Sequence, residues 1–302
     1  MDLIPLLTAA RVTVVAGKGG VGKTTVTAVL ATAAAAAGLR VLAVELDGKP
    51  VLASLLGDVP HLALSAQMAL EEYLREHGLG RIAKRLSSSG VIDVVSTAAP
   101  GIDDIVVLGK IKHLERCGEW DAIIVDGPAA GHAVTMLTSA SGLRDAVTGG
   151  PVRTQADDVL EMLHDATRLQ VALVTLPEST PVNETVETAF RLEDRVGVRL
   201  APVIVNGVDG GPGLAGRTGE LSDLVETVDV SDVDRTVLAA AAGFRDERLA
   251  VQLAAITHLA ETLPLAQIHV PLVPTARLDH AAVAELVGSV RSPSGGGGGG
   301  DS

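Results

Sequence analysis

Cysteine is almost absent from this chain, because Cys117 is the only one among its 302 residues. A single thiol excludes internal disulfide frameworks and metal sites closed by several thiolates of one chain. One free thiol also suits a reducing compartment, and the acidic start with Asp2 does not resemble a signal peptide. We therefore expect a cytoplasmic protein.

Aromatic residues and positive charge are scarce as well. Aromatics make up 1% of the chain against 47% hydrophobic residues, so the core must be aliphatic. The formal net charge is −13, whereas nucleic-acid binding depends on Lys and Arg that neutralise phosphates. We therefore expect no nucleic-acid partner. The uncharged stretch 24–39 opens with threonines, so we interpret it as a buried core helix and expect no stable membrane insertion.

What is present is a glycine-rich phosphate-binding loop at residues 17–24, Gly-Lys-Gly-Gly-Val-Gly-Lys-Thr. The β-branched run before it predicts a buried parallel strand, and the Ala-rich run after it, to Ala37, predicts a helix. Strand, loop and helix N-terminus together form a cradle of backbone N–H groups for phosphates, so we expect ATP as the ligand. The residues expected to bind the nucleotide here are Gly17, Gly19, Gly20, Val21, Gly22, Lys23, Thr24 and Thr25.

The two lysines of this loop have different expected roles. Lys23 closes the ordinary phosphate-loop pattern and should contact the β- and γ-phosphates, while the Thr24 hydroxyl should bind Mg²⁺. Lys18 is not required by that pattern. A second cation at this place indicates a nucleotide site that works at a subunit interface.

Acidic residues follow two further strands, at the edge of the expected sheet where ligands bind. Glu45 and Asp47 end the strand that begins at Leu39, and a carboxylate there can orient or deprotonate the attacking water. The alternative for each of them is a solvated acid at a strand end. Asp126 ends the apolar run 122–125 and is expected to hold Mg²⁺ or its waters.

The segment 127–132 after Asp126 is short and contains glycine, so we expect it to be a switch loop that responds to the γ-phosphate. Its His132 either contacts a partner or the catalytic water, or is an ordinary loop histidine. Asn206 follows the strand 201–205, and its amide matches the hydrogen-bonding edge of adenine. The alternative for Asn206 is an asparagine that only serves a turn.

Strands and helices alternate along the rest of the chain, which favours a doubly wound α/β fold with three layers and a mostly parallel sheet. We expect one P-loop ATPase domain over residues 1–290, with helical insertions at about 62–88 and 134–168. The glycine-rich tail 291–302 should be disordered. Other expected strands lie at 91–95, 169–175 and 267–270, and other expected helices at 103–116, 157–167, 183–196, 246–263 and 279–290.

The phosphate loop with Lys18, then Asp47, then Asp126 with His132, resembles the deviant Walker A ATPases. Within them the chain is most similar to the arsenite-pump ATPases and the ATPases that target tail-anchored proteins. The resemblance covers Val12 to about Val290, and only the two phosphate-side motifs in it are highly specific.

This resemblance implies roles for individual residues. Asp47 falls on the family's catalytic Asp, although the following residues 48–50 depart from the usual sequence. Glu178 falls where the family places a nucleotide-contacting Glu, and Asn206 falls on its adenine-binding Asn. Pro271 begins a segment that resembles the loop closing over the adenine.

The resemblance also implies a mechanism, in which ATP is sandwiched between the subunits of a homodimer or of a heterodimer with a related ATPase. Lys18 of one subunit would reach the phosphates of the other, and Asp47 would position water. Hydrolysis would then change a face that binds a protein partner or a hydrophobic client.

Absences in the sequence separate this chain from some relatives and leave alternatives open. Arsenite activation in the family needs a cysteine cluster, and zinc-bridged targeting factors need paired cysteines, whereas this chain has only Cys117. Methionines for a client groove are few. The alternatives are a scaffold or regulatory subunit that pairs with a related ATPase, and a partition or membrane-surface ATPase of the MinD/ParA type.

Overall fold

A parallel β-sheet forms the centre of the computed structural model, which describes residues 3–46, 51–76, 101–209, 231–273, 275 and 277–290. Within these residues the sheet has eight strands in the order β3-β2-β4-β1-β5-β7-β8, with β6 beside β5, and every pairing is parallel. The strands are β1 (Val12–Gly17), β2 (Val41–Glu45), β3 (His61–Ala63), β4 (Ala122–Ala129), β5 (Leu169–Thr175), β6 (Arg199–Leu200), β7 (Val203–Val208) and β8 (Gln267–Pro271).

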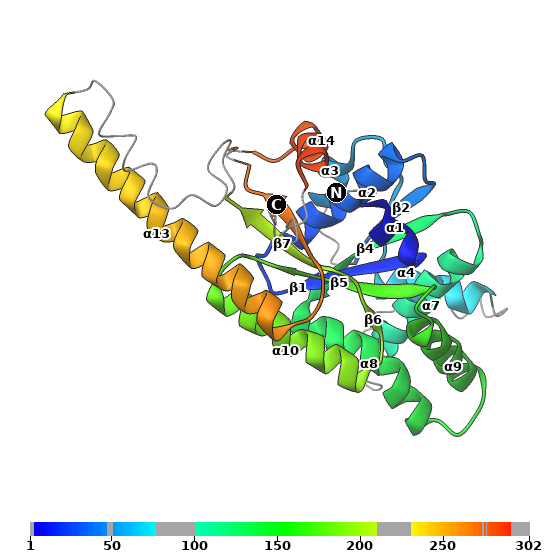
Figure 1. The fold of residues 1–302 in the computed structure, drawn as a ribbon. Helices are drawn as coiled ribbons and strands as arrows, with labels where there is room; N and C mark the ends of the chain where they lie inside the picture. The colour runs from blue at the N-terminus through cyan, green and yellow to red at the C-terminus, as the bar shows by residue number, and fades with distance from the viewer. Residues whose placement is uncertain are drawn as a thin grey trace, which may run out of the picture.

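Helices cover both faces of this sheet, as Figure 1 shows. Side chains alternate along β1, so Val12 and Val14 belong to one apolar core and Val15 to the other. The expected three-layer α/β fold with a parallel sheet is thus confirmed. The helices are α1 (Ile4–Ala9), α2 (Lys23–Ala36), α3 (Val51–Leu56), α4 (Ala66–Glu76), α7 (Ile102–Arg116), α8 (Ala130–Ala146), α9 (Pro151–His164), α10 (Ser179–Arg195), α13 (Asp232–Thr262) and α14 (His280–Ser289).

The two cores are aliphatic, as the composition requires. One lies between the sheet and α7 to α10, and the other lies between the sheet and α1, α2, α3 and α14. Trp120, the single tryptophan, is partly buried against the first core and stands just before β4.

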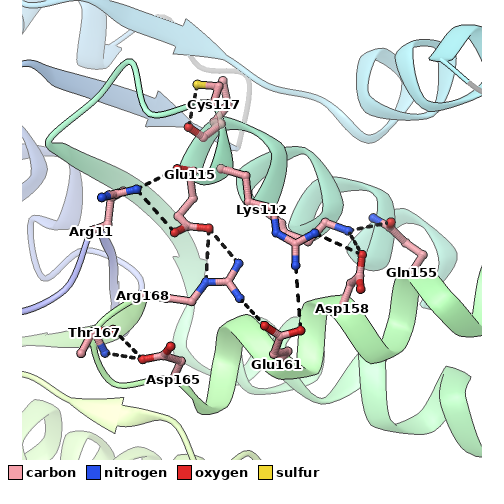
Figure 2. Close-up of polar contacts among 12 residues, drawn as sticks. Arg11, Lys112, Glu115, Cys117, Gln155, Asp158, Glu161, Asp165, Thr167 and Arg168 are labelled. Atoms are coloured by element: carbon pink, nitrogen blue, oxygen red, sulfur yellow. Dashed lines mark hydrogen bonds and ion pairs between the residues drawn. The ribbon is translucent and has the colours of Figure 1, made fainter.

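A charged network closes the amino-terminal end of the sheet (Figure 2). The buried Glu115 of α7 accepts hydrogen bonds from Arg168 Nη2 at 2.8 Å and Nε at 3.3 Å. Arg11, which precedes β1, lies 3.8 Å from the other Glu115 oxygen. Arg168 also reaches Glu161 of α9 at 3.2 Å. Because a buried carboxylate is expensive unless it is paired, this network fixes α7 and α9 against the starts of β1 and β5.

Most differences from the sequence expectations concern where elements end. β4 continues to Ala129 and α8 begins at Ala130, so the expected switch loop 127–132 is strand and helix instead. Gly127 permits this course, because a Cβ on it would lie 2.5 Å from the Val15 carbonyl oxygen of the neighbouring strand. The expected strand at 91–95 and the tail 291–302 lie outside the described residues.

The helix expected to begin at residue 246 begins instead at Asp232, because Ser231 accepts a hydrogen bond from the Asp234 amide and caps the longer helix. Figure 1 shows the first half of α13 extending away from the body of the domain. Arg245 and Gln252 attach the middle of the helix to Asp209, just after β7. The residues before Arg245 therefore extend beyond the carboxyl end of β7.

Candidate functional site

The phosphate loop connects β1 to α2 at the carboxyl edge of the sheet, and its glycines are needed for two different reasons. Gly17 packs against β5 so closely that a Cβ would lie 2.4 Å from the Val174 carbonyl oxygen. Gly20 and Gly22 have φ values of 89° and 87°, a region that residues with a Cβ rarely adopt. The backbone can therefore curl tightly around an anion at the start of α2.

Asn206 holds the loop from the neighbouring strand β7. Its Nδ2 donates a 2.9 Å hydrogen bond to the Val21 carbonyl oxygen, and a Cβ on Gly22 would come within 2.2 Å of the same nitrogen. Asn206 lies inside β7 instead of following the strand. One half of its amide is thus used to support the loop, and contact with adenine remains a prediction.

Lys23 turns back over the loop from the first residue of α2. Its Nζ donates to the Lys18 carbonyl oxygen at 3.3 Å. The first backbone N–H groups of α2, from Lys23, Thr24 and Thr25, have no partner within a helix and carry the positive end of its dipole. A flexible ammonium above a ring of N–H groups is the arrangement that binds a chain of phosphates.

Thr24 and Asp126 meet beside this cradle. The Thr24 hydroxyl donates to Asp126 Oδ2 at 2.7 Å, and the Thr27 hydroxyl lies 3.4 Å from Oδ1. Asp126 is buried although it is acidic. A hydroxyl and a carboxylate oxygen side by side, next to a phosphate cradle, are hard oxygen ligands of the kind that Mg²⁺ prefers. The donor set therefore fits Mg²⁺ held by Thr24 and Asp126.

Glu45 lies next to Asp126 in the sheet, since the two residues are paired between β2 and β4. Burial raises the pKa of the Glu45 carboxyl and the nearby Asp126 charge raises it further, while backbone hydrogen bonds from Leu52 and Val51 oppose the shift. Those bonds direct Glu45 to the start of α3. Asp47, the expected catalytic residue, lies outside the described residues.

Lys18 does not contact the phosphate cradle with its side chain. Its ammonium donates to Glu184 Oε1 in α10 at 2.6 Å, and both side chains are partly exposed. Sequence reasoning missed Glu184, because this residue of α10 is 166 positions from Lys18 and only the folded chain brings the two together. Thr27 was also missed, although its spacing of three from Thr24 places both on one face of α2.

Glu178 and the Pro271 segment border a separate groove beside the loop. Glu178 precedes α10, and together with Gly207 and Leu272 it lines a cavity of about 590 Å³ whose far wall is α13. Pro271 ends β8, and Leu272 after it donates its backbone N–H to the Val208 carbonyl oxygen at 2.9 Å. Their contact with nucleotide remains a prediction.

His132 lies in the first turn of α8 and is largely exposed. Its Nε2 is 3.8 Å from Asp104 Oδ1, and both residues border a cavity of about 210 Å³. Burial raises the pKa of the Asp104 carboxyl, and the His132 charge opposes that shift. His132 thus faces α7, and neither of its two expected roles is decided by this position.

Comparison with known proteins adds three findings. The model of the CobQ/CobB/MinD/ParA nucleotide-binding domain family matches residues 12–215. ATPase BagA of Mycobacterium tuberculosis is 33% identical over 225 residues, which cover 66% of each chain. The arsenical pump-driving ATPase of Escherichia coli is 29% identical over 195 residues, which cover 63% of this chain and 33% of that protein.

This chain covers only part of the length of the relatives that it matches. The chain spans 66% of the length of the BagA relative and about a third of the pump-driving ATPase of Halobacterium salinarum, with which it shares 27% identity. Among the described residues, each helix is too short or too polar to cross a membrane.

Proposed function

Because the chain belongs to the CobQ/CobB/MinD/ParA nucleotide-binding family, as a match over residues 12–215 establishes, we propose that it binds and hydrolyses ATP at the loop 17–25. The observation that carries this proposal is the contact of 2.7 Å between Thr24 and Asp126, directly beside a glycine-rich anion cradle. Relatives that are named as ATPases support the same activity.

In this proposal each residue of the loop has a defined task. The N–H groups from Gly19 to Thr25 hold the phosphate oxygens, and Lys23 neutralises charge on the β- and γ-phosphates. Thr24 and Asp126 would hold Mg²⁺, which when bound neutralises charge that develops between the β- and γ-phosphates. Asp47 orients the attacking water.

We further propose that hydrolysis requires a dimer, with Lys18 donated to the phosphates of the partner subunit. Lys18 starts from an exposed position at the edge of the loop and is bonded to a neighbouring helix instead of to its own cradle. A cation with that placement can be presented to a second molecule. Its charge would then stabilise the transferred phosphoryl group only after assembly.

The step coupled to this dimer is the binding and release of a protein partner or client. Asp126 connects the Mg²⁺ position to β4 and, through Ala129, to the start of α8. A change at the γ-phosphate can therefore move α8 and the surface beside it.

Replacement of two lysines tests the proposal. Lys18→Ala should abolish ATP hydrolysis while ATP binding stays within about threefold, because Lys18 acts only in the assembled transition state. Lys23→Ala should weaken ATP binding itself. The measurements are steady-state phosphate release and equilibrium binding of a fluorescent ATP analogue. Unchanged turnover in Lys18→Ala would overturn the shared-site mechanism, and unchanged ATP binding in Lys23→Ala would overturn the nucleotide site.

A further inference from the structure

The projecting half of α13 exposes an unusual amount of apolar surface. Val233 is 75% exposed, and Val237 and Phe244 are each 64% exposed. Val251, in the second half of the helix, is 55% exposed, and Leu238 and Leu253 are exposed outside the row that these four residues form. A single helix of this kind gains little stability from its own hydrogen bonds in water and normally depends on packing of one face. Its first half extends away from the body of the domain in Figure 1.

Val233, Val237, Phe244 and Val251 follow a heptad repeat. Val237, Phe244 and Val251 are spaced by seven, and Val233, Ala240, Glu247 and Ala254 lie four residues before or three after them. This is the pattern of the a and d positions of a coiled coil, here over three heptads or about 33 Å of helix. The stripe therefore has the form of a helix-pairing surface.

The opposite side of α13 contacts its own domain. Ala242 is buried there, and Arg245 and Gln252 bond to Asp209 after β7. Past Ala254 the next residue of the stripe, His258, is bonded to Asn183 of the chain's own helix α10. Within the part of the chain that the structure describes, the stripe from Val233 to Ala254 is thus left for a partner.

We propose that this stripe, the α13 seam, pairs antiparallel with the α13 seam of a second copy of this chain. Antiparallel pairing centred on Ala242 places Phe244 of each copy opposite the small Ala240 of the other, and Val251 opposite Val233. The large Phe244 then faces a small residue, as close packing favours, while the same register places Val237 opposite Glu247. The same face serves both copies, so the contact is two-fold symmetric and closes after two chains.

Charges beside the seam fit the same register. Asp234 and Arg248 each directly follow a core position of the repeat, Val233 and Glu247, and the proposed register places Asp234 of one copy beside Arg248 of the other, twice by symmetry. Such flanking ion pairs select orientation and partner in coiled coils. Glu247 is the one charged core position, and a single polar core residue fixes register at some loss of stability.

The groove beside Glu178 provides room for the end of the partner helix. Phe244 and Val251 line this cavity of about 590 Å³ on one side, and residues 176–180 line it on the other. The proposed register brings Val233 of the partner, with the first turn of its helix, to this place. The pairing uses no residue of the phosphate loop and should therefore occur without nucleotide, although Glu178, an expected nucleotide contact, borders the same groove.

Site-directed cross-linking tests the register directly. Both test variants carry Cys117→Ser. In the proposed dimer the thiol introduced by Ala241→Cys lies near the two-fold axis, close to the same thiol of the second copy. The thiol introduced by Ala239→Cys lies on the side of the helix away from the partner. With a short bismaleimide and no ATP, the Ala241→Cys chain should become a covalent dimer at least about tenfold faster than the Ala239→Cys control. Equal rates, or no cross-linking of either chain, would overturn the proposal.

A charge exchange tests the partner contact without reference to cross-linking. Asp234→Arg and Arg248→Asp should each raise the dimer Kd about tenfold, and the double exchange should restore it. Phe244→Ala should raise the Kd by about a hundredfold or more. Sedimentation equilibrium of the full chain gives these values. A chain that stays monomeric to about 100 μM, or a double exchange that restores nothing, would overturn self-pairing.

Discussion

The Lys18 ammonium donates a hydrogen bond of 2.6 Å to Glu184, which lies 166 residues later in α10 of the same chain. A lysine required by a partner subunit must leave this carboxylate before it can act across the interface. In the proposed mechanism Glu184 would be a positioning residue that competes with the partner subunit for Lys18. The strength of this competition is limited, because an exposed ion pair contributes about 1 kcal/mol at most.

Glu184→Gln should lower the protein concentration at which ATP hydrolysis becomes half-maximal, by about two- to fivefold, because Lys18 is released for the partner. The measurement is turnover against protein concentration at saturating ATP. Glu187→Gln is the matched control, since Glu187 lies in the same helix and pairs with the exposed Arg191 instead. A Glu184→Gln curve that coincides with the control would refute competition for Lys18.

Gly22→Ala should destabilise the protein by about 1–2 kcal/mol from its positive φ alone, with a further loss from contact with Asn206. ATP binding should be lost as well, because the loop can no longer close. Gly19→Ala is the control for stability, since a Cβ there meets no atom within 4 Å. Urea unfolding measures both variants, and equal losses would contradict the assigned strain.

Asp126→Asn should reduce hydrolysis about 10- to 100-fold, because the residue that orients Thr24 and would hold Mg²⁺ loses its charge. The Mg²⁺ concentration for half-maximal activity should rise in parallel. Asp145→Asn, at an exposed position in α8, serves as the control and should leave both values unchanged. A Mg²⁺ dependence equal to that of the parent chain would exclude Asp126 from the metal site.

Glu115→Ala should destabilise folding by about 3 kcal/mol, because it leaves Arg168 largely buried without its main partner. Glu161→Ala removes an exposed partner of the same arginine and should cost less than about 1 kcal/mol. Thermal and urea unfolding of both variants measure the difference. Similar losses of unfolding free energy in the two variants would show that the burial of Glu115 does not determine how much the network stabilises the fold.

Asp121 should contribute to acid unfolding. Hydrogen bonds from Arg40 lower the pKa of the Asp121 carboxyl from 3.8 to about 2. Because the folded pKa lies below the unfolded one, this contribution is fully present above pH 3.8 and is lost as the pH falls toward 2. In Asp121→Asn the slope of unfolding free energy against pH should decrease by up to about one proton in that interval. An unchanged slope would contradict the shift.

How far the sequence predicts this molecule depends on how local each signal is. The phosphate loop, the strand before it and Asp126 were predictable because each has a local signal: the glycines of the loop, the β-branched run before it, and the apolar run 122–125 that leads directly to Asp126. The parallel sheet follows from alternation of strands and helices, and the structure confirms it.

Features that depend on distant contacts were not predictable in the same way. Lys18 meets Glu184, and Asn206 supports Val21, through neighbours that only the folded sheet brings together. The segment 127–132 has loop-like glycine and proline, yet pairing with β1 draws its first half into β4. The start of α13 was missed because Ala242 is the only buried residue in the first half of this helix, so that half shows no core-facing pattern.

The scarcity of aromatic residues has a practical consequence for following this protein in solution. Trp120 is the only tryptophan, and it packs partly buried just before β4, the strand that carries Asp126. Because the chain has no other tryptophan, the fluorescence emission of Trp120 reports on the surroundings of β4. Stopped-flow fluorescence of the unlabelled chain would show whether ATP binding near Asp126 changes the structure around Trp120, at the amino-terminal side of the same strand.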